Sequence, residues 1–479
     1  RSTRQTITKN IFWLSISQVG SRLIRAIIII YSARVLGAAE YGVFSYALSL
    51  AGFFTVFADL GINQILTREL VREPEKQQYF FSTAFWLKMA VLTLTAVLII
   101  FAAPHFSKIE AAKILIPLVA LITIFDGLRD FTLSSFRAAE KMEYEALLTI
   151  ITNVAITVFG FAAIAVSATA KSLTLSYAFS VAIGFVAGLF ILKEKFLKIF
   201  SHFKKELVKP ILTAAFPIVF TALLGVFMLN TDIIMIGWWR TPEEIGYYSA
   251  GQRILQILYT LPAILATSMF PILNRFVSRK EKEKEKFLME KTMAMVYGVA
   301  TPIFVGGVIL ATSIIKFIYG KEYLPAVLSF QVLLLTPFLI YPLMLLGNLI
   351  LAHNEQSKLK LPVFFGAVGN IALNVLLIPP FGIVGSAIAT VIAQFLNVGL
   401  TWRAAKKISD FSTLKYLKKI FASAIIMGFF SMVFNFTGLN VIINIILSAG
   451  IYFYSLYLMK EEIFKDILSL IPFLKKFAN

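Results

Sequence analysis

The chain has 479 residues, of which 58% are hydrophobic, and its mean hydropathy is +0.82. Soluble globular proteins hold about 45–50% apolar residues, so this composition predicts an all-α polytopic membrane protein. The net charge of +19 would suit a nucleic-acid partner in a soluble protein. Here the basic residues gather between apolar runs, where they set membrane orientation, so we expect no nucleic-acid partner. The absence of cysteine excludes disulfides and thiolate metal sites, and we expect neither a metal centre nor a cofactor.

The sequence contains about fourteen segments long enough to cross a bilayer as helices, each with roughly 20 apolar residues. The first half gives 11–36, 41–66, 80–103, 114–136, 146–168 and 173–192. The second half gives 211–238, 246–272, 293–318, 326–351, 361–379 and 383–402, followed by a further pair at 420–436 and 439–459.

A short internal repeat divides these spans into two halves. Glu40, Gly42, Phe44 and Ser45 open the second span, and Glu244, Gly246, Tyr248 and Ser249 open the eighth at the same offset. Two six-helix lobes related by a pseudo-two-fold axis along the membrane normal would follow, as in transporters built from parallel repeats. The predicted divisions are an N-terminal lobe (1–192), an amphipathic linker (193–209), a C-terminal lobe (210–403), two extra helices (404–459) and an amphipathic tail (460–479).

The distribution of basic residues predicts the orientation. Most of the 45 Lys and Arg lie in the termini and in the loops on the same side as the termini. Few flank the opposite side: Lys108, Lys113, Lys171, Arg240, Lys316 and Lys321. By the positive-inside rule both termini are cytoplasmic, and we expect a multi-pass protein of the cell membrane.

The first apolar segment carries a polar stripe. Ser15, Gln18, Arg22 and Arg25 share one side of a helix with 3.6 residues per turn. An arginine near the middle of a spanning helix costs about 2.5–3.5 kcal/mol on insertion scales, so it is expected to face protein, water or a charged ligand. We therefore predict that this stripe lines an aqueous cavity between the two lobes.

Other intramembrane cations extend this predicted cavity. Gln252 and Arg253 form a second polar stripe with Ser249 and Gln256. Lys88 and Arg129 also fall within spans. The planar fork of arginine binds phosphate oxygens in pairs, which favours a phosphate-bearing ligand. The candidate substrate-binding residues are Arg22, Arg25, Arg253, Lys88, Arg129, Gln18 and Gln252.

The alternative is that these cations pair with intramembrane carboxylates. Asp126, Arg129 and Asp130 lie within one helical turn and could neutralise one another. Asp59 and Asp232 are more isolated in the sequence. Asp59, Asp126 and Asp232 are candidates for ion coupling or gating, and Asp59 and Asp232 could equally be helix-end anchors. A set of amides could hydrogen-bond sugars or tie helices together, and both interpretations stay open: Asn153, Asn370, Asn374, Gln394 and Asn397.

The chain resembles the polysaccharide transport family, the Wzx-type oligosaccharide flippases of the multidrug/oligosaccharidyl-lipid/polysaccharide superfamily. The matching segments are Ala33-Arg34-Val35-Leu36-Gly37, Glu40-Tyr41-Gly42, Ala58-Asp59-Leu60-Gly61, Asn230-Thr231-Asp232 and Ile245-Gly246-Tyr247-Tyr248. The resemblance implies transfer of polyprenyl-pyrophosphate-linked oligosaccharides from the cytoplasmic to the outer leaflet by alternating access. Similar lipid II flippases place cavity arginines at positions that match Arg22 and Arg253, whereas the role of Arg25 depends on the stripe alone.

Two other members of the superfamily are alternatives: a multidrug antiporter and a lipid II flippase. The antiporters typically use carboxylates in spans one and five, and this chain has none there. A membrane glycosyltransferase would need paired catalytic side chains near a sizeable external domain, so we expect no enzymatic activity. The expected partners are a polyprenyl-pyrophosphate-linked glycan and membrane lipids, with proton or sodium coupling, in a monomer.

Overall fold

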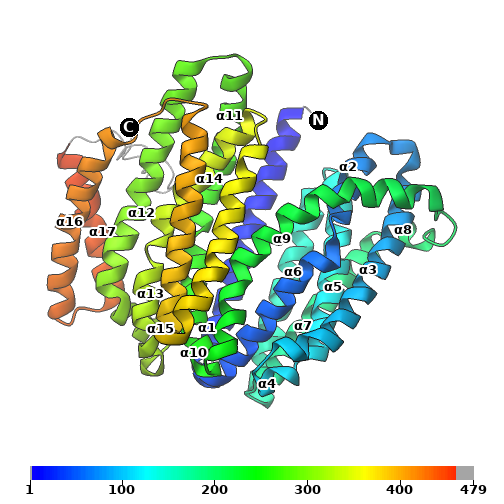
Figure 1. Cartoon of the computed structure of the whole chain (residues 1–479), viewed down its shortest axis with the longest axis horizontal. Coiled ribbons are helices and arrows are strands. Elements are labelled where there is room, and N and C mark those ends of the chain that lie inside the picture. Colours follow the sequence, from blue (N-terminus) through cyan, green and yellow to red (C-terminus); the bar gives the residue numbers. More distant parts are fainter. Residues whose placement is uncertain (1–2, 460–479) are drawn as a thin grey trace. The chain divides into compact units, whose positions relative to one another are not determined.

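The computed structural model describes residues 3–459. The side chains of residues 3–12, 14–19, 74, 106, 216–218, 220–225, 227–229 and 414–416 lie outside the description. The described residues form helices and connecting turns without strands, as the composition predicts (Figure 1). The predicted tail at 460–479 lies outside the described residues.

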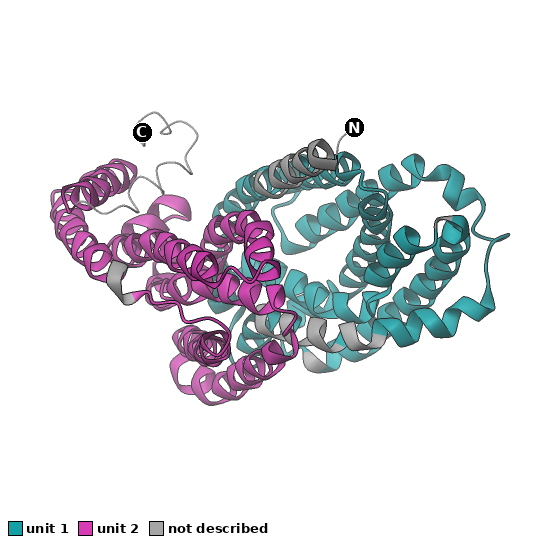
Figure 2. Ribbon diagram, turned by 90° about the horizontal axis from the view of Figure 1, so that it is seen from above, with its two compact units in different colours: residues 1–249 teal, residues 250–479 magenta. Residues whose placement is uncertain are grey.

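The chain forms two compact units, Arg1–Ser249 and Ala250–Asn479, whose boundary falls inside one helix (Figure 2). Unit 1 contains α1 (Thr3–Asp59), α2 (Ile62–Arg72), η1 (Pro74–Lys76), α3 (Gln77–Phe106), α4 (Glu110–Lys113), α5 (Ile116–Ala138), α6 (Met142–Val166), α7 (Ala170–Ile191), α8 (Lys193–Leu197), η2 (Lys205–Leu207), α9 (Val208–Trp239) and the start of α10 (Pro242–Leu258). Unit 2 contains the rest of α10, then α11 (Thr260–Ser278), α12 (Lys282–Ile318), η3 (Lys321–Ala326), α13 (Val327–Leu333), α14 (Thr336–Ala352), α15 (Ser357–Lys406), α16 (Leu414–Phe436) and α17 (Val441–Leu458).

Every predicted span coincides with one or two of these helices. Among the described residues, nine helices are long and apolar enough to cross a membrane, and a tenth arises if α13 with the preceding turn and α14, bent by 42°, count as one span. This count is lower than the fourteen predicted spans, partly because α1 and α15 each contain two predicted spans joined at a kink. The kinks lie at Gly37 (φ 76°) and Gly382 (φ 58°), where the positive φ favours glycine.

The second predicted span ends earlier than expected. Helix α1 stops at Asp59, and Leu60 and Gly61 adopt left-handed φ values of 45° and 73° before α2 begins. This break leaves Asp59 at the end of α1 and places residues 62–66 of the predicted span in α2. The carboxylate of Asp59 accepts a hydrogen bond from the backbone N–H of Asn63 at 3.4 Å.

The core of unit 1 holds α1 against α5, α6, α7 and α9. An aromatic cluster joins α3 to α5, with Phe81 and Phe85 packed on Phe131. Phe196 of α8 also packs on Phe81 and Phe85, whereas Phe200, one turn beyond α8, is exposed. The linker therefore turns one aromatic ring inward and another outward. Its helical residues are divided among α8, η2 and the start of α9.

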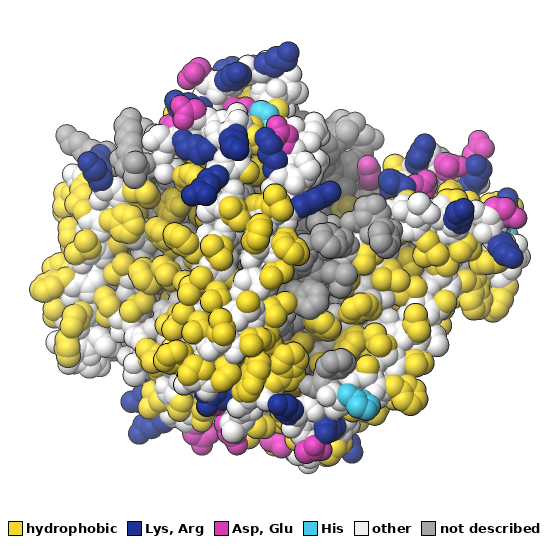
Figure 3. Space-filling model, in the orientation of Figure 1, with side chains coloured by type: hydrophobic (Ala, Val, Ile, Leu, Met, Phe, Trp, Pro, Cys, Tyr) yellow, Lys and Arg dark blue, Asp and Glu magenta, His cyan; other side chains and the backbone are white. Residues whose placement is uncertain are grey.

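The core of unit 2 is built around α12, which packs on α11, α14, α16 and α17. On the visible face of the molecule, hydrophobic side chains cover the middle stretches of the helices (Figure 3). Lys, Arg, Asp and Glu gather at the helix ends on that face (Figure 3). This banding is expected of helices surrounded by lipid along their middle portions.

Candidate functional site

Arg25 on α1 is held by uncharged partners. Its Nε donates a hydrogen bond of 2.8 Å to Oδ1 of Asn153 on α6. Its guanidinium also lies over the ring of Tyr177 on α7, 5.8 Å from the centroid. Asn153 is buried, and its Nδ2 donates to the carbonyl of Thr149 at 2.7 Å. Three helices therefore position one cation, and the amide of Asn153 ties α1 to α6.

The other members of the first stripe are less enclosed or lie outside the description. Arg22 is exposed and makes further contacts of its own. The side chain of Gln18 lies outside the described part of the chain, although its backbone belongs to α1. Their predicted contact with substrate therefore stays a prediction.

Lys88 on α3 forms an ion pair with Asp59 at the end of α1. The distance from Nζ to Oδ1 is 2.7 Å, and the side chain of Lys88 is only 1% exposed, against 23% for Asp59. A lysine so buried requires a charged or strongly polar partner, because an isolated ammonium in a medium of low polarity is unstable. The helix break after Asp59 thus places a carboxylate where α3 presents its cation.

Arg129 on α5 pairs with two carboxylates of its own helix. Its Nη2 lies 2.8 Å from Oδ1 of Asp126 and 3.2 Å from Oδ1 of Asp130, so the local pairing expected as an alternative occurs. A methyl group on Gly184 of α7 would lie 3.2 Å from Cδ of Arg129, so this glycine makes room for the arginine.

Arg253 on α10, in unit 2, again has an amide partner. Its Nη1 donates a hydrogen bond of 2.9 Å to Oε1 of Gln256, one turn further along the helix. Its Nε is buried and meets no acceptor among the described side chains. Gln252 is half-buried beside it. Arg253, in the second predicted stripe, therefore has an N–H donor that makes no hydrogen bond with the described side chains.

Asp232 on α9 is a buried anchor within unit 1. The hydroxyl of Tyr248 donates a hydrogen bond of 2.7 Å to its Oδ2, and Asp232 is 2% exposed. The contact joins α9 to α10. It supports the helix-end interpretation of Asp232 more than a role in an aqueous cavity.

The amides left open in the sequence differ in their contacts. In α15, Nδ2 of Asn374 donates to Oδ1 of Asn370 one turn away at 3.0 Å, and both residues are buried. Asn153 joins two helices, because it accepts from Arg25 of α1. Tyr177 was missed by sequence reasoning, because nothing in an apolar helix marks the ring that will lie under a distant guanidinium.

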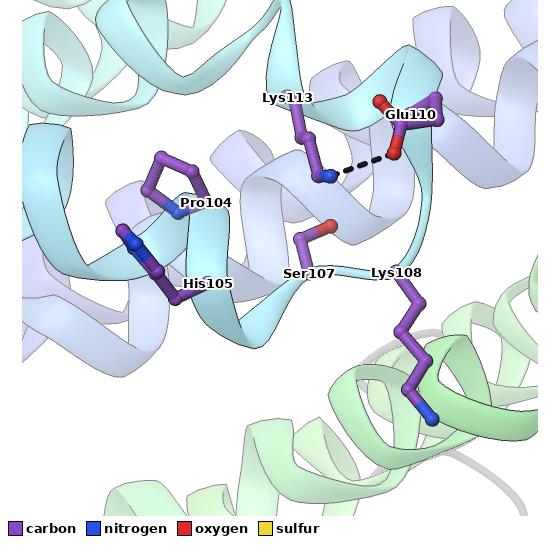
Figure 4. Close-up of a pocket in the computed structure, with 6 residues that line it drawn as sticks. All are labelled: Pro104, His105, Ser107, Lys108, Glu110 and Lys113. Atoms are coloured by element: carbon purple, nitrogen blue, oxygen red, sulfur yellow. Dashed lines mark hydrogen bonds and ion pairs between the residues drawn. The ribbon is translucent and has the colours of Figure 1, made fainter.

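An open hollow of about 560 Å³ lies at the end of α3, on the side predicted to face outward (Figure 4). Its lining combines residues of α3, α4 and their connection: Pro104, His105, Ser107, Lys108, Glu110 and Lys113. Lys113 pairs with Glu110 at 2.6 Å, and Nδ1 of His105 bonds the carbonyl of Phe101 at 2.9 Å. These local partners give no reason to place the substrate here.

Comparison with known proteins gives a consistent picture. The family model described as polysaccharide biosynthesis protein matches residues 7–277, and the MatE model matches residues 217–379. The chain is 23% identical to the probable low-salt glycan biosynthesis flippase Agl15 of Haloferax volcanii, over 98% of this chain and 99% of that protein. It is 20% identical to a putative O-antigen transporter of Escherichia coli, over 82% of this chain and 96% of that protein.

Solved structures share the fold. The inward closed conformation of the lipid II flippase MurJ superposes with a TM-score of 0.76 at 19% identity, over 93% of this chain and 98% of that chain. An inward-facing multidrug resistance MATE transporter of the MOP superfamily superposes with a TM-score of 0.63 at 13% identity, over 83% of this chain and 97% of that chain. The predicted all-α membrane-protein fold is confirmed, and the exact number of fourteen spans stays a prediction.

Proposed function

We infer, because the chain belongs to the polysaccharide biosynthesis protein family, that it is a flippase carrying a lipid-linked glycan across the membrane, and not an enzyme. The family model covers more than half of the chain. Relatives that align over most of its length are named as a glycan biosynthesis flippase and an O-antigen transporter. The flippase predicted from the sequence is therefore the main interpretation.

The proposed substrate is a polyprenyl-pyrophosphate-linked oligosaccharide, moved from the cytoplasmic to the outer leaflet by alternating access. The observation that carries this proposal is the pairing of Arg25 with the neutral Asn153 and not with a carboxylate. Arg253 and Gln256 repeat that arrangement. Guanidinium groups that keep their charge suit the oxygens of a pyrophosphate. Arg22, Gln18 and Gln252 are proposed as further substrate-binding residues.

Lys88 and Arg129 are proposed to support this surface and not to bind substrate directly. Each already has a carboxylate at ion-pair distance, Asp59 for Lys88 and Asp126 for Arg129. Removing such a partner leaves an uncompensated buried charge, which is strongly destabilising. Binding through either cation would require it to leave its partner.

Ion coupling is proposed at Asp126. In unit 1, Lys88 pairs with Asp59, and Arg129 pairs with Asp126 and Asp130. A pyrophosphate entering near Arg25 would bring at least two further negative charges into unit 1. A proton or a sodium ion taken up at Asp126 would offset part of that negative charge.

The protein is proposed to act as a monomer in the cell membrane with both termini in the cytoplasm. Positive charge at the ends of predicted cytoplasmic loops supports this orientation. The chain has no cysteine, so single cysteines can be introduced without removing any. A cysteine in place of Lys284 should be shielded from an impermeant thiol reagent added outside, and one in place of Glu243 should react.

The substrate class is tested by mass spectrometry of lipids that co-purify with the protein. We expect polyprenyl pyrophosphates carrying sugars to be enriched over the bulk membrane lipids. The MatE match at residues 217–379 makes a cation antiporter the second candidate. Bound cationic drugs without polyprenyl-linked glycans would favour the antiporter and reject the flippase.

A further inference from the structure

Four of the buried or half-buried cations of the chain fall into two classes by the charge of their partners. Lys88 and Arg129 contact carboxylates. Arg25 and Arg253 contact amide oxygens. A carboxylate both holds and neutralises a cation, whereas an amide oxygen holds it and leaves its charge intact. The two classes therefore differ in how much positive charge remains for a ligand.

We propose that Asn153 and Gln256 are positioning residues that hold Arg25 and Arg253 in place while preserving their charge for the substrate's pyrophosphate. This proposal builds on the proposed function and names side chains through which the two arginines act. Neither amide needs to touch the substrate. Each fixes one edge of a guanidinium so that its remaining donors are oriented before the ligand arrives.

The geometry at Asn153 fixes the direction of its amide. Its Nδ2 donates to the carbonyl of Thr149 at 2.7 Å, so Oδ1 is the atom left to face Arg25, which it meets at 2.8 Å. The bond uses Nε of Arg25. The terminal nitrogens of Arg25 make no hydrogen bond and no ion pair among the residues that the structure describes. Four N–H donors of the guanidinium therefore remain for a ligand.

Tyr177 restricts the remaining freedom of Arg25. The ring lies 5.8 Å from the guanidinium carbon, within the range of a cation–π contact. A ring face attracts a cation without supplying a negative charge. Asn153 from α6 and Tyr177 from α7 thus position Arg25 through two neutral contacts.

Gln256 holds Arg253 in a different way, from one turn along the same helix. Its Oε1 accepts from Nη1 at 2.9 Å, and Nε of Arg253 stays buried without an acceptor among the described side chains. A buried donor without a partner is costly, so a ligand oxygen that satisfies it gains that free energy on binding. Both arginines are therefore oriented, charged and incompletely hydrogen-bonded.

The test is to replace each amide with the carboxylate of nearly the same shape. Full-length protein in lipid nanodiscs is titrated with farnesyl pyrophosphate, with farnesol as the uncharged probe, for the wild type, Asn153→Asp and Gln256→Glu. We expect both variants to bind farnesyl pyrophosphate roughly tenfold more weakly or worse, because the new carboxylate occupies and neutralises the arginine. The dependence of affinity on salt should also flatten, since one fewer cation meets the anion.

Two controls separate positioning from a general structural effect. Asn435→Asp places a carboxylate on α16 at an amide that accepts from the hydroxyl of Ser313, and it should leave binding unchanged. In the Arg25→Gln background, Asn153→Asp should cause no further loss, because its effect passes through Arg25. Gln256→Glu, at a half-buried position, keeps the proposal testable if Asn153→Asp fails to fold.

Three results would overturn the proposal. Wild-type affinity in both carboxylate variants would show that the neutral partners are irrelevant. An equal loss from Asn153→Asp with or without Arg25 would show that the amide acts elsewhere. Both of these leave the proposed function standing. A wild type that binds farnesyl pyrophosphate no better than farnesol would reject the proposed substrate class and the positioning role together.

Discussion

Gly42 and Gly246 occupy reciprocal positions in unit 1, each facing the backbone one helical turn before the other. A methyl group on Gly42 would lie 1.8 Å from the carbonyl oxygen of Pro242, and one on Gly246 would lie 2.1 Å from that of Ala38. Pro242 precedes Gly246 by as many residues as Ala38 precedes Gly42. The repeat seen in the sequence is therefore a pair of equivalent backbone contacts, at which no side chain fits.

The first prediction is that a methyl group at either position disrupts this crossing. Gly42→Ala and Gly246→Ala should each lower the free energy of unfolding by about 1–3 kcal/mol or more, because backbone and not a flexible side chain blocks the new atom. Thermal unfolding in detergent and transport in vesicles measure the effect. Gly347→Ala is the matched control, since nothing lies within 4 Å of the added methyl group. Gly42→Ala and Gly246→Ala variants as stable and active as Gly347→Ala would contradict the contact.

The second prediction concerns the ion pair of Lys88 and Asp59. Lys88→Met should destabilise unit 1 by about 3–5 kcal/mol, because it leaves Asp59 without its cation. The double variant Lys88→Met with Asp59→Asn should recover most of that loss, since it removes both charges. Melting temperatures of the three proteins test this. If the double variant melts lower than Lys88→Met, the pair is not the source of the stability.

The double variant also distinguishes a structural role of Lys88 from a direct role in transport. If Lys88 only supports the fold, the double variant should still flip substrate. Loss of transport in a stable double variant would instead return Lys88 to the substrate-binding residues.

The third prediction is a pH dependence at the linker. Burial lowers the pKa of Lys195 on α8, and the nearby Lys141 lowers it further. A lysine whose pKa is lower in the folded protein destabilises the fold while it is charged. That cost is fully present at neutral pH and is lost as the pH rises from the folded pKa to the ordinary value of 10.5.

Replacing Lys195 tests whether its charge destabilises the fold at neutral pH. Lys195→Gln should raise the melting temperature at pH 7, and the gain over the wild type should shrink as the pH approaches 10.5. Lys193→Gln, an exposed neighbour on the same short helix, should show no such pH-dependent gain. A Lys195→Gln gain that stays constant or grows at high pH would contradict the assigned cause.

The sequence predicted a helical segment at each long apolar run, because such runs are dictated by the lipid surroundings and need no tertiary information. That each of the fourteen crosses the membrane stays a prediction. It did not predict that α1 stops at Asp59, since the break depends on the left-handed backbone of Leu60 and Gly61. Nor did it predict which carboxylate Lys88 would meet. Lys88 and Asp59 lie on different helices, and the rotation of each helix about its axis is set by packing across the whole unit.

The sequence proposed some residues of the candidate site, and their role in binding stays a prediction. The two polar stripes identified Arg25 and Arg253 as intramembrane cations that are expected to face protein, water or a charged ligand. The sequence also predicted that Arg129 could pair with Asp126, because these residues lie one helical turn apart. The contact of Arg25 with Asn153 could not be predicted, since their separation in the chain carries no information about distance in the fold.

The fourth prediction is that membrane potential drives the proposed outward transport. A polyprenyl pyrophosphate carries at least two negative charges, and each charge that crosses the field gains about 2.3 kcal/mol per 100 mV when the interior is negative. Flipping in liposomes with a potassium–valinomycin potential and no ion gradient should therefore be faster at inside-negative potential. Indifference to potential, with dependence on a proton or sodium gradient, would assign the driving force to a counter-ion.

The central claim is that this chain flips a pyrophosphate-linked glycan by means of Arg25 and Arg253. Proteoliposomes containing a fluorescent polyprenyl-pyrophosphate oligosaccharide in both leaflets are treated with dithionite, which bleaches only the outer leaflet. With the wild type, we expect the inner-leaflet fluorescence to be lost as well, because the lipid keeps exchanging between leaflets. Stable, reconstituted Arg25→Gln and Arg253→Gln variants should leave that fraction protected, as empty liposomes do. Protection by the wild type, or full bleaching with both arginines replaced, would contradict the claim.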